Sequence, residues 1–135
     1  MFSTIISSMI TPKNANSSDF AVSWLGFQRS PAGTAMWSAS QWVVDCYVGW
    51  TFDRPEELWG GIIEISKSEL SDEEIAQLGA GPLESLLSEN YPQFSQLVFH
   101  LARKNDVIFL ALEHVNPPDE HEIDFEKELS DLQDG

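Results

Sequence analysis

The side chains in this sequence that are best suited to chemistry are paired carboxylates. Glu56 and Glu57 are adjacent, and so are Glu73 and Glu74. Two carboxyl groups held close together can divide the roles of general acid and general base. Each pair, however, falls in the first turn of an expected helix, where carboxylates stabilise the positive end of the helix dipole. We therefore interpret both pairs as helix-start signals and predict no catalytic residues here.

Thiol, imidazole and metal chemistry have no stronger pattern. Cys46 is the single cysteine, and its apolar neighbours predict a buried, unreactive thiol. His100 and His114 have no acidic or cysteine partner at catalytic spacing. Residues 119–122 (DEHE) are metal-binding types without an element to order them. Phosphate-loop, dinucleotide, serine-hydrolase and zinc-protease motifs are absent from the sequence. We therefore expect a protein that is not an enzyme, with no metal and no cofactor.

The charge balance is the most informative property of the chain. Its 135 residues include 22 Asp and Glu against 7 Lys and Arg, a formal net charge of −15. Such a surface repels nucleic acid and anionic lipid, which bind through Lys and Arg, and it attracts basic proteins. We expect a basic protein partner, and neither nucleic acid nor membrane. The candidate contact residues are the acids at two helix starts: Glu56, Glu57, Asp72, Glu73 and Glu74.

Capping signals mark the expected helices in the first part of the chain. The spacing of three aromatic residues predicts a helix over residues 18–27. A second helix has Pro55 in its first turn, and a third ends near residue 78. The capping residues are Ser18 or Asp19, then Asp53, then Ser71 with Glu74 as a capping box.

The second part of the chain continues in the same way. The run Gly79–Pro82 predicts a tight connection, and its last residue, Pro82, is expected to begin the next helix. Asn90 and Pro92 predict the start of another helix, and Asp106 predicts the start of the last one before the tail. The expected buried face of the helix after Asn90 consists of Phe94, Leu97, Val98 and Leu101.

Residues 35–52 allow two interpretations. Their apolar residues share a helical face, yet the stretch Gln41–Trp50 is rich in the β-branched and aromatic residues of strands. We favour a mostly buried helix because the neighbouring elements are helical. Gly60 and Gly61 lie inside the next helix at a cost of about 1 kcal/mol each relative to alanine. They predict a neighbouring helix or bulky ring packed close to that backbone.

The last residues differ in composition from the rest. Residues 119–135 hold eight Asp and Glu and one Lys. They form either a solvated acidic tail or a mobile arm that docks on a basic partner. The spacing of Ile123, Phe125, Leu129 and Leu132 permits one weak amphipathic helix. Because this segment has much charge and few apolar groups, we expect rapid amide exchange along it.

Together these elements predict an all-α fold. We expect a small orthogonal helical bundle or a short stack of helical hairpins, about six or seven helices in all, with an acidic C-terminal tail. Residues 1–17 are expected to be a loosely ordered N-terminal segment, residues 18–116 the helical domain and residues 117–135 the tail. The chain has neither a secretory signal pattern nor an apolar run of membrane-spanning length. We expect a cytoplasmic protein, and no oligomeric state follows from the sequence.

Residues 53–115 resemble a bacterial family of unknown function. The similarity is carried by a D-x-P-E-x-x-W pattern that starts at Asp53, by residues 78–87 (LGAGPLESLL) and by Ala102–Arg103. The resemblance implies a small helical protein with no established activity. By analogy of class, small acidic proteins of this kind are similar to the immunity proteins that neutralise polymorphic toxins.

Three functions follow from charge and resemblance. The leading hypothesis is a non-catalytic acidic binding protein, an immunity protein that neutralises a cognate bacterial toxin by direct binding. The first alternative is a DNA-mimic inhibitor of a nucleic-acid-binding protein. The second is a regulatory or structural adaptor.

Overall fold

The computed structural model describes residues 13–134, and every regular element within them is helical. The all-α prediction is therefore confirmed, and the stretch Gln41–Trp50 is helical from Trp42 onward. The chain divides into two compact units, residues 1–67 and residues 68–135. The expectation for the N-terminal segment falls mostly on residues 1–12, which lie outside the described residues. Of the rest of that segment, Ala15 is buried and Asn16 caps the first described helix.

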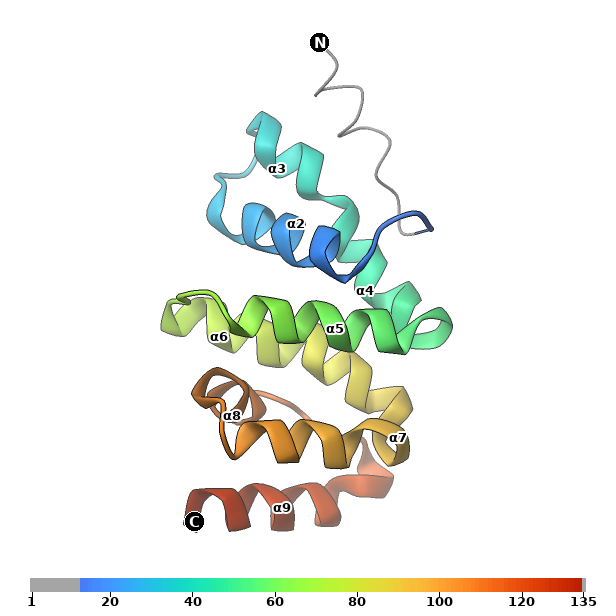
Figure 1. Cartoon of the computed structure of the whole chain (residues 1–135), viewed down its shortest axis with the longest axis vertical. Coiled ribbons are helices and arrows are strands. Elements are labelled where there is room, and N and C mark those ends of the chain that lie inside the picture. Colours follow the sequence, from blue (N-terminus) through green and yellow to red (C-terminus); the bar gives the residue numbers. More distant parts are fainter. Residues whose placement is uncertain (1–12, 135) are drawn as a thin grey trace. The chain divides into compact units, whose positions relative to one another are not determined.

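Unit 1 is built around helix α2, which packs against α3, α4 and α5. The bounds of these helices (Figure 1) are Ser17–Arg29 for α2, Ala35–Ser40 for α3, Trp42–Asp53 for α4 and Pro55–Ser66 for α5. The cap of α2 is Asn16, not Ser18 or Asp19. The Asn16 side chain accepts the N–H of Asp19, and the Asp19 carboxylate accepts the N–H of Asn16 in return. The helix thus starts earlier than predicted, because the stronger reciprocal cap lies upstream.

Aromatic rings fill the core of unit 1. The Phe20 and Trp50 rings are both buried, and their centroids lie 5.5 Å apart. A Cβ on Gly61 would lie 2.7 Å from a carbon of the Phe20 ring, and a Cβ on Gly60 would overlap the Ser17 side chain. The prediction that a helix or ring packs close to this double glycine is therefore confirmed, and helix α2 supplies both contacts.

The junction between α4 and α5 differs from the prediction. Asp53 is the last residue of α4, and the N-cap position of α5 is Arg54, which makes no side-chain capping bond. A single residue joins the two helices, so Asp53 cannot leave α4 to cap α5. Pro55 occupies the first position of α5 as predicted. The Arg54 guanidinium instead lies 4.7 Å from the centroid of the Trp50 ring.

Helix α4 is only half buried. Val44, Val48 and Phe52 are 39%, 51% and 66% exposed, and they lie four residues apart on one face. We call these three residues the α4 stripe. Because most residues of α4 are apolar, its sequence predicted a mostly buried helix and did not reveal which face would be left uncovered. The opposite face of α4 is buried through Val43, Cys46 and Trp50.

Unit 2 places its helices around the long helix α7, which packs against α8 and α9. The elements are α6 (Asp72–Leu78), the π-helical turn η1 (Gly79–Leu83), α7 (Glu84–Ala102), α8 (Asp106–Leu112), the 3₁₀ turn η2 (Asp119–His121) and α9 (Glu122–Asp134). The capping box of Ser71 and Glu74 at the start of α6 is confirmed. No strand occurs among the residues of this unit that the structure describes.

The predicted tight connection at Gly79–Pro82 is a π-helical turn instead. The backbone stays helical from α6 through η1 into α7, and the wider turn accommodates Pro82, which lacks an N–H. Gly79 lies where α8 approaches most closely, because a Cβ added there would overlap the backbone carbonyl of Ala111. Glycine at this position thus permits backbone contact between η1 and α8.

Helix α7 bends where a new helix start was predicted. Asn90 has the non-helical angles φ −126° and ψ 29°, so two helical segments meet at a kink there, in agreement with the predicted helix start. Pro92 lies two residues on and weakens the hydrogen-bond ladder there. The predicted buried face was partly wrong, because Leu97 is 51% exposed while Ser95 and Phe99 are buried. Helix α7 is covered by both α8 and α9, so its buried face is wider than one apolar row.

Glu84 has a structural role at the start of α7. Its carboxylate accepts the backbone N–H of Asn116 at 2.7 Å, although the two residues are 32 positions apart. This hydrogen bond ties the start of α7 to the chain after α8 and does not cap the helix to which Glu84 belongs. A charged acceptor makes this one of the stronger kinds of hydrogen bond.

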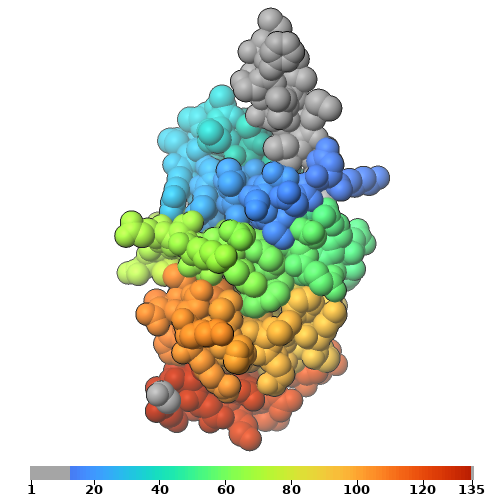
Figure 2. Space-filling view, viewed as in Figure 1, coloured from blue at the N-terminus to red at the C-terminus, as the bar shows by residue number. Residues whose placement is uncertain are grey.

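The acidic C-terminal segment is an ordered helix and not a solvated tail. Phe125 of α9 is 1% exposed, and its ring meets Phe99 of α7 edge-on at 5.7 Å. In the space-filling view the red atoms of α9 lie directly against the orange atoms of unit 2 (Figure 2). Burial of one aromatic side chain contributes about 1.5–3 kcal/mol, and an edge-to-face pair adds about 0.5–1.5 kcal/mol. The many charges of this segment did not reveal the anchor, because the burial of a single ring depends on its contacts with α7.

Candidate partner-binding surface

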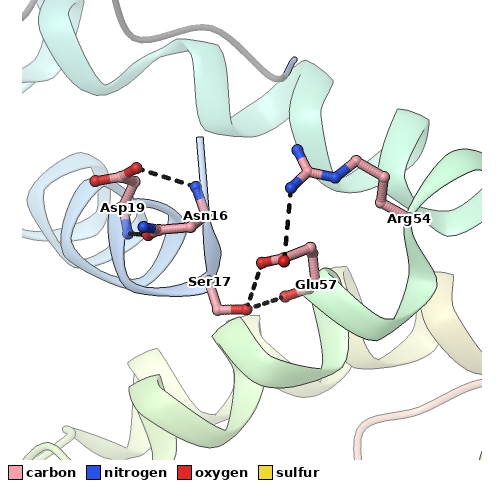
Figure 3. Close-up of polar contacts among 5 residues, drawn as sticks. All are labelled: Asn16, Ser17, Asp19, Arg54 and Glu57. Atoms are coloured by element: carbon pink, nitrogen blue, oxygen red, sulfur yellow. Dashed lines mark hydrogen bonds and ion pairs between the residues drawn. The ribbon is translucent and has the colours of Figure 1, made fainter. Parts of the chain in front are cut away.

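Glu57 is engaged inside unit 1. The Ser17 hydroxyl lies 2.8 Å from the Glu57 carboxylate and 2.8 Å from the Glu57 carbonyl oxygen (Figure 3). The Arg54 guanidinium lies 3.6 Å from the other carboxylate oxygen. These contacts tie the start of α2 to the start of α5. Glu57 therefore helps to hold the fold together, and less of its carboxylate is available to a partner.

Glu74 is engaged in a similar way in unit 2. Its carboxylate accepts the N–H of Ser71 at 3.0 Å, and the Ser71 hydroxyl accepts the N–H of Glu74 at 3.1 Å. Asp72 and Glu73, in the same turn, are exposed, as is Glu56 at the start of α5. Of the five predicted contact residues, these three are the exposed ones.

The predicted contact residues are divided between the two units. Glu56 and Glu57 belong to unit 1, whereas Asp72, Glu73 and Glu74 belong to unit 2. A group of three His, Cys, Asp or Glu side chains arranged to hold a metal ion does not occur among residues 13–134. The acids are thus spread over helix starts, each within its own unit.

A groove between α7 and α9 gathers polar side chains that the sequence reasoning did not single out. It has a volume of about 420 Å³ and lies wholly within unit 2. Helix α7 contributes Tyr91 and Ser95, the turn η2 contributes His121, and α9 contributes acids and a lysine. The charged residues that line it are Asp124, Lys127 and Glu128. We call it the α7–α9 groove.

Tyr91 is the central residue of the α7–α9 groove. Its ring stacks on the His121 ring with centroids 4.5 Å apart and planes 14° apart. Burial, together with the negative charges of Asp124 and Glu128, raises the pKa of the Tyr91 phenol to about 12. The phenol is therefore neutral at physiological pH and can both donate and accept a hydrogen bond.

One signal in the sequence could have led to this groove. Asp124 and Glu128 are four residues apart, and Phe125 lies between them. If Phe125 faces inward, the two acids flank it on one side of the helix. The partner residue Tyr91 is more than 30 positions away and carries no local mark, so only the fold joins the two segments.

Cys46 is fully buried in α4, as predicted. Burial, opposed by the nearby Arg54 guanidinium, raises the pKa of the thiol to about 12. The thiol is therefore protonated and sheltered, and a nucleophilic role does not fit it.

None of the helices in the described part of the chain is long and apolar enough to cross a membrane.

The comparisons with known proteins place the chain in a family. No curated protein and no solved structure matches the sequence. A family of unknown function, DUF6869, matches residues 31–123, a longer stretch than the resemblance over residues 53–115. Because the match spans more than half of the sequence, the chain belongs to this family.

Proposed function

We propose that this protein is a non-catalytic acidic binding protein that neutralises a basic protein partner, a bacterial toxin being the leading candidate. The observation that carries the proposal is the ordered state of α9. Its anchor at Phe125 holds a strongly acidic segment in one conformation. Acids fixed on a helix can match a basic surface without the ordering entropy that a mobile tail would lose on binding. A cytoplasmic site of action is part of the proposal.

Charge also sets how such a complex forms. A net charge of −15 attracts a basic partner from a distance and raises the association rate more than the final affinity. The exposed acids Glu56, Asp72 and Glu73 add to this field in the two units. Glu57 and Glu74 are poor positions for a test, because reversing them would break the contacts with Ser17 and Ser71 described above.

The test is the association rate of the full chain with its partner, first isolated by low-salt capture and then purified. Because salt screens surface charge, we expect the rate to fall about tenfold or more between 0.05 and 0.5 M salt. Reversal of Glu56, Asp72 and Glu73 to Lys should slow association further while the far-UV circular dichroism spectrum is unchanged. Gln77→Lys, an exposed position in α6, is the control for added positive charge alone.

Two results would count against this function. Turnover of a small substrate by the purified chain would contradict a binding role without catalysis. An association rate indifferent to salt, with all three reversals silent, would contradict an acidic interface. In that case the α4 stripe would be the surface to examine, since apolar residues dominate interfaces that do not depend on charge.

A further inference from the structure

The α7–α9 groove contains hydroxyl groups that the fold does not use. Tyr91 and Ser95 lie one helical turn apart on α7, both line the groove, and each is only 6% exposed. Neither hydroxyl makes a hydrogen bond to another of the described residues. No fully buried side-chain oxygen or nitrogen among residues 13–134 lacks a partner. The two hydroxyl oxygens must therefore be reachable from the groove.

Hydroxyl groups at this depth can serve a ligand. A nearly buried polar group needs a hydrogen-bond partner, and a group that enters the groove can supply it. Tyr91 and Ser95, one turn apart and open to the same space, can both bond to one such group. The groove is too polar for an apolar side chain, since hydroxyls, carboxylates and the Gln96 amide line it.

The charges of the groove select a cation. Asp124 and Glu128 are one turn apart on α9, and both act on the Tyr91 phenol. Lys127 is the one cationic side chain in the lining, so the ionised residues leave the groove negative. A negative groove on a molecule of charge −15 repels phosphate and carboxylate ligands and concentrates cations.

The shape of the groups favours guanidinium over ammonium. The groove is lined by four side chains with acceptor oxygens, those of Tyr91, Ser95, Asp124 and Glu128. A guanidinium group is planar and carries five N–H donors. An ammonium group has three donors and no flat face, so it would use fewer of the acceptors present.

We propose that the α7–α9 groove binds the guanidinium group of an arginine side chain from the basic partner. The carboxylates of Asp124 and Glu128 pair with its charge. The hydroxyls of Tyr91 and Ser95 accept its other N–H groups. The protein origin of the arginine rests on the proposed function, whereas the affinity of the groove for guanidinium does not.

The first experiment titrates the ¹⁵N-labelled full chain with Nα-acetyl-arginine methylamide and follows the amide shifts by NMR. We expect saturable shifts centred on Tyr91, Ser95, Asp124 and Glu128, with a Kd of about 1 mM, as suits a single side chain. The citrulline analogue has the same shape and no charge, and it should cause no saturable shift. The lysine analogue should bind several-fold more weakly than arginine.

Variants separate the groove from general acidity. Asp124→Asn and Glu128→Gln should each weaken arginine binding about tenfold, because each removes a charge-assisted hydrogen bond. Glu126→Gln is the matched control, an exposed acid of the same helix outside the groove, and it should change affinity less than about twofold. Lys127→Gln should tighten binding about two- to fivefold by removing a like charge. Misfolding cannot produce that gain.

The outcomes distinguish this proposal from the function on which it rests. Shifts spread over all acidic surfaces, with Glu126→Gln weakening arginine binding as much as Asp124→Asn, would contradict specific binding in the groove. A second outcome is that arginine binds the groove while Asp124→Asn and Glu128→Gln still bind the partner normally. This would show that the bound guanidinium does not come from the partner and would point to a small guanidinium compound. Loss of partner binding in those variants and not in Glu126→Gln would support both parts.

Discussion

Gly79→Ala should destabilise unit 2 by about 3 kcal/mol, at the upper end for an overpacked site. The added Cβ overlaps the carbonyl of Ala111, a backbone group that cannot rotate away as a side chain can. Either η1 or α8 must move, and α8 is held by its buried residues Ile108 and Leu112. Helix propensity acts in the opposite direction by about 1 kcal/mol and is too small to compensate.

Gly49→Ala is the matched control for this substitution. Gly49 also lies inside a helix, α4, but a Cβ there would meet nothing within 4 Å. The same change should therefore stabilise unit 1 by about 0.5–1 kcal/mol. Urea unfolding followed by far-UV circular dichroism measures both changes. All five tryptophans lie in residues 24–59, so tryptophan fluorescence reports on unit 1 by itself. Equal stability of Gly79→Ala and the unaltered protein would show that the close contact between η1 and α8 is not made.

Phe125→Ala should release α9 from α7. Truncation of a buried aromatic ring costs about 3–5 kcal/mol, and Phe125 is the one fully buried side chain among the described residues of α9. If the free energy of undocking α9 is smaller than this cost of truncation, α9 undocks, and the protein loses only the undocking free energy. Amide exchange over residues 122–134 should then become rapid, while exchange in α8 stays slow.

Ile123→Ala serves as the control in the same helix. Ile123 is 85% exposed, so its truncation should change stability by less than about 0.5 kcal/mol. A second measurement follows the Tyr91 phenol, because undocking removes Asp124 and Glu128 from its surroundings. Its pKa should fall from about 12 toward the ordinary tyrosine value in Phe125→Ala and should stay in place in Ile123→Ala. Slow exchange over residues 122–134 in Phe125→Ala would mean that charged contacts and not this ring hold the helix.

The sequence predicted those parts of the fold that depend on neighbours along the chain. The capping box of Ser71 and Glu74 and the position of Pro55 need only a few adjacent residues, and both are confirmed. The prediction of close packing at Gly60 and Gly61 also succeeded, because the cost of two glycines in a helix demands a neighbour. The identity of that neighbour did not follow from the sequence.

Parts that depend on distant contacts were missed. The depth of Phe125 depends on Phe99, and the wide turn at Gly79 depends on Ala111, which follows 32 residues later. The α7–α9 groove requires two segments whose sequences say nothing of each other. The predicted contact acids raise a different difficulty. A carboxylate at a helix start gives the same sequence pattern whether it stabilises the helix or binds a partner.

The α4 stripe also bears on how the protein behaves in concentrated solution. The α4 stripe is an exposed apolar strip. At neutral pH the repulsion between highly charged molecules keeps the strips of different molecules from touching. Near the isoelectric point of about 4.2 that repulsion vanishes, and exposed apolar strips on different molecules can then meet. Colloidal stability of this protein thus depends on its acids, and a Phe52→Ser variant should stay dispersed at pH values where the unaltered chain precipitates.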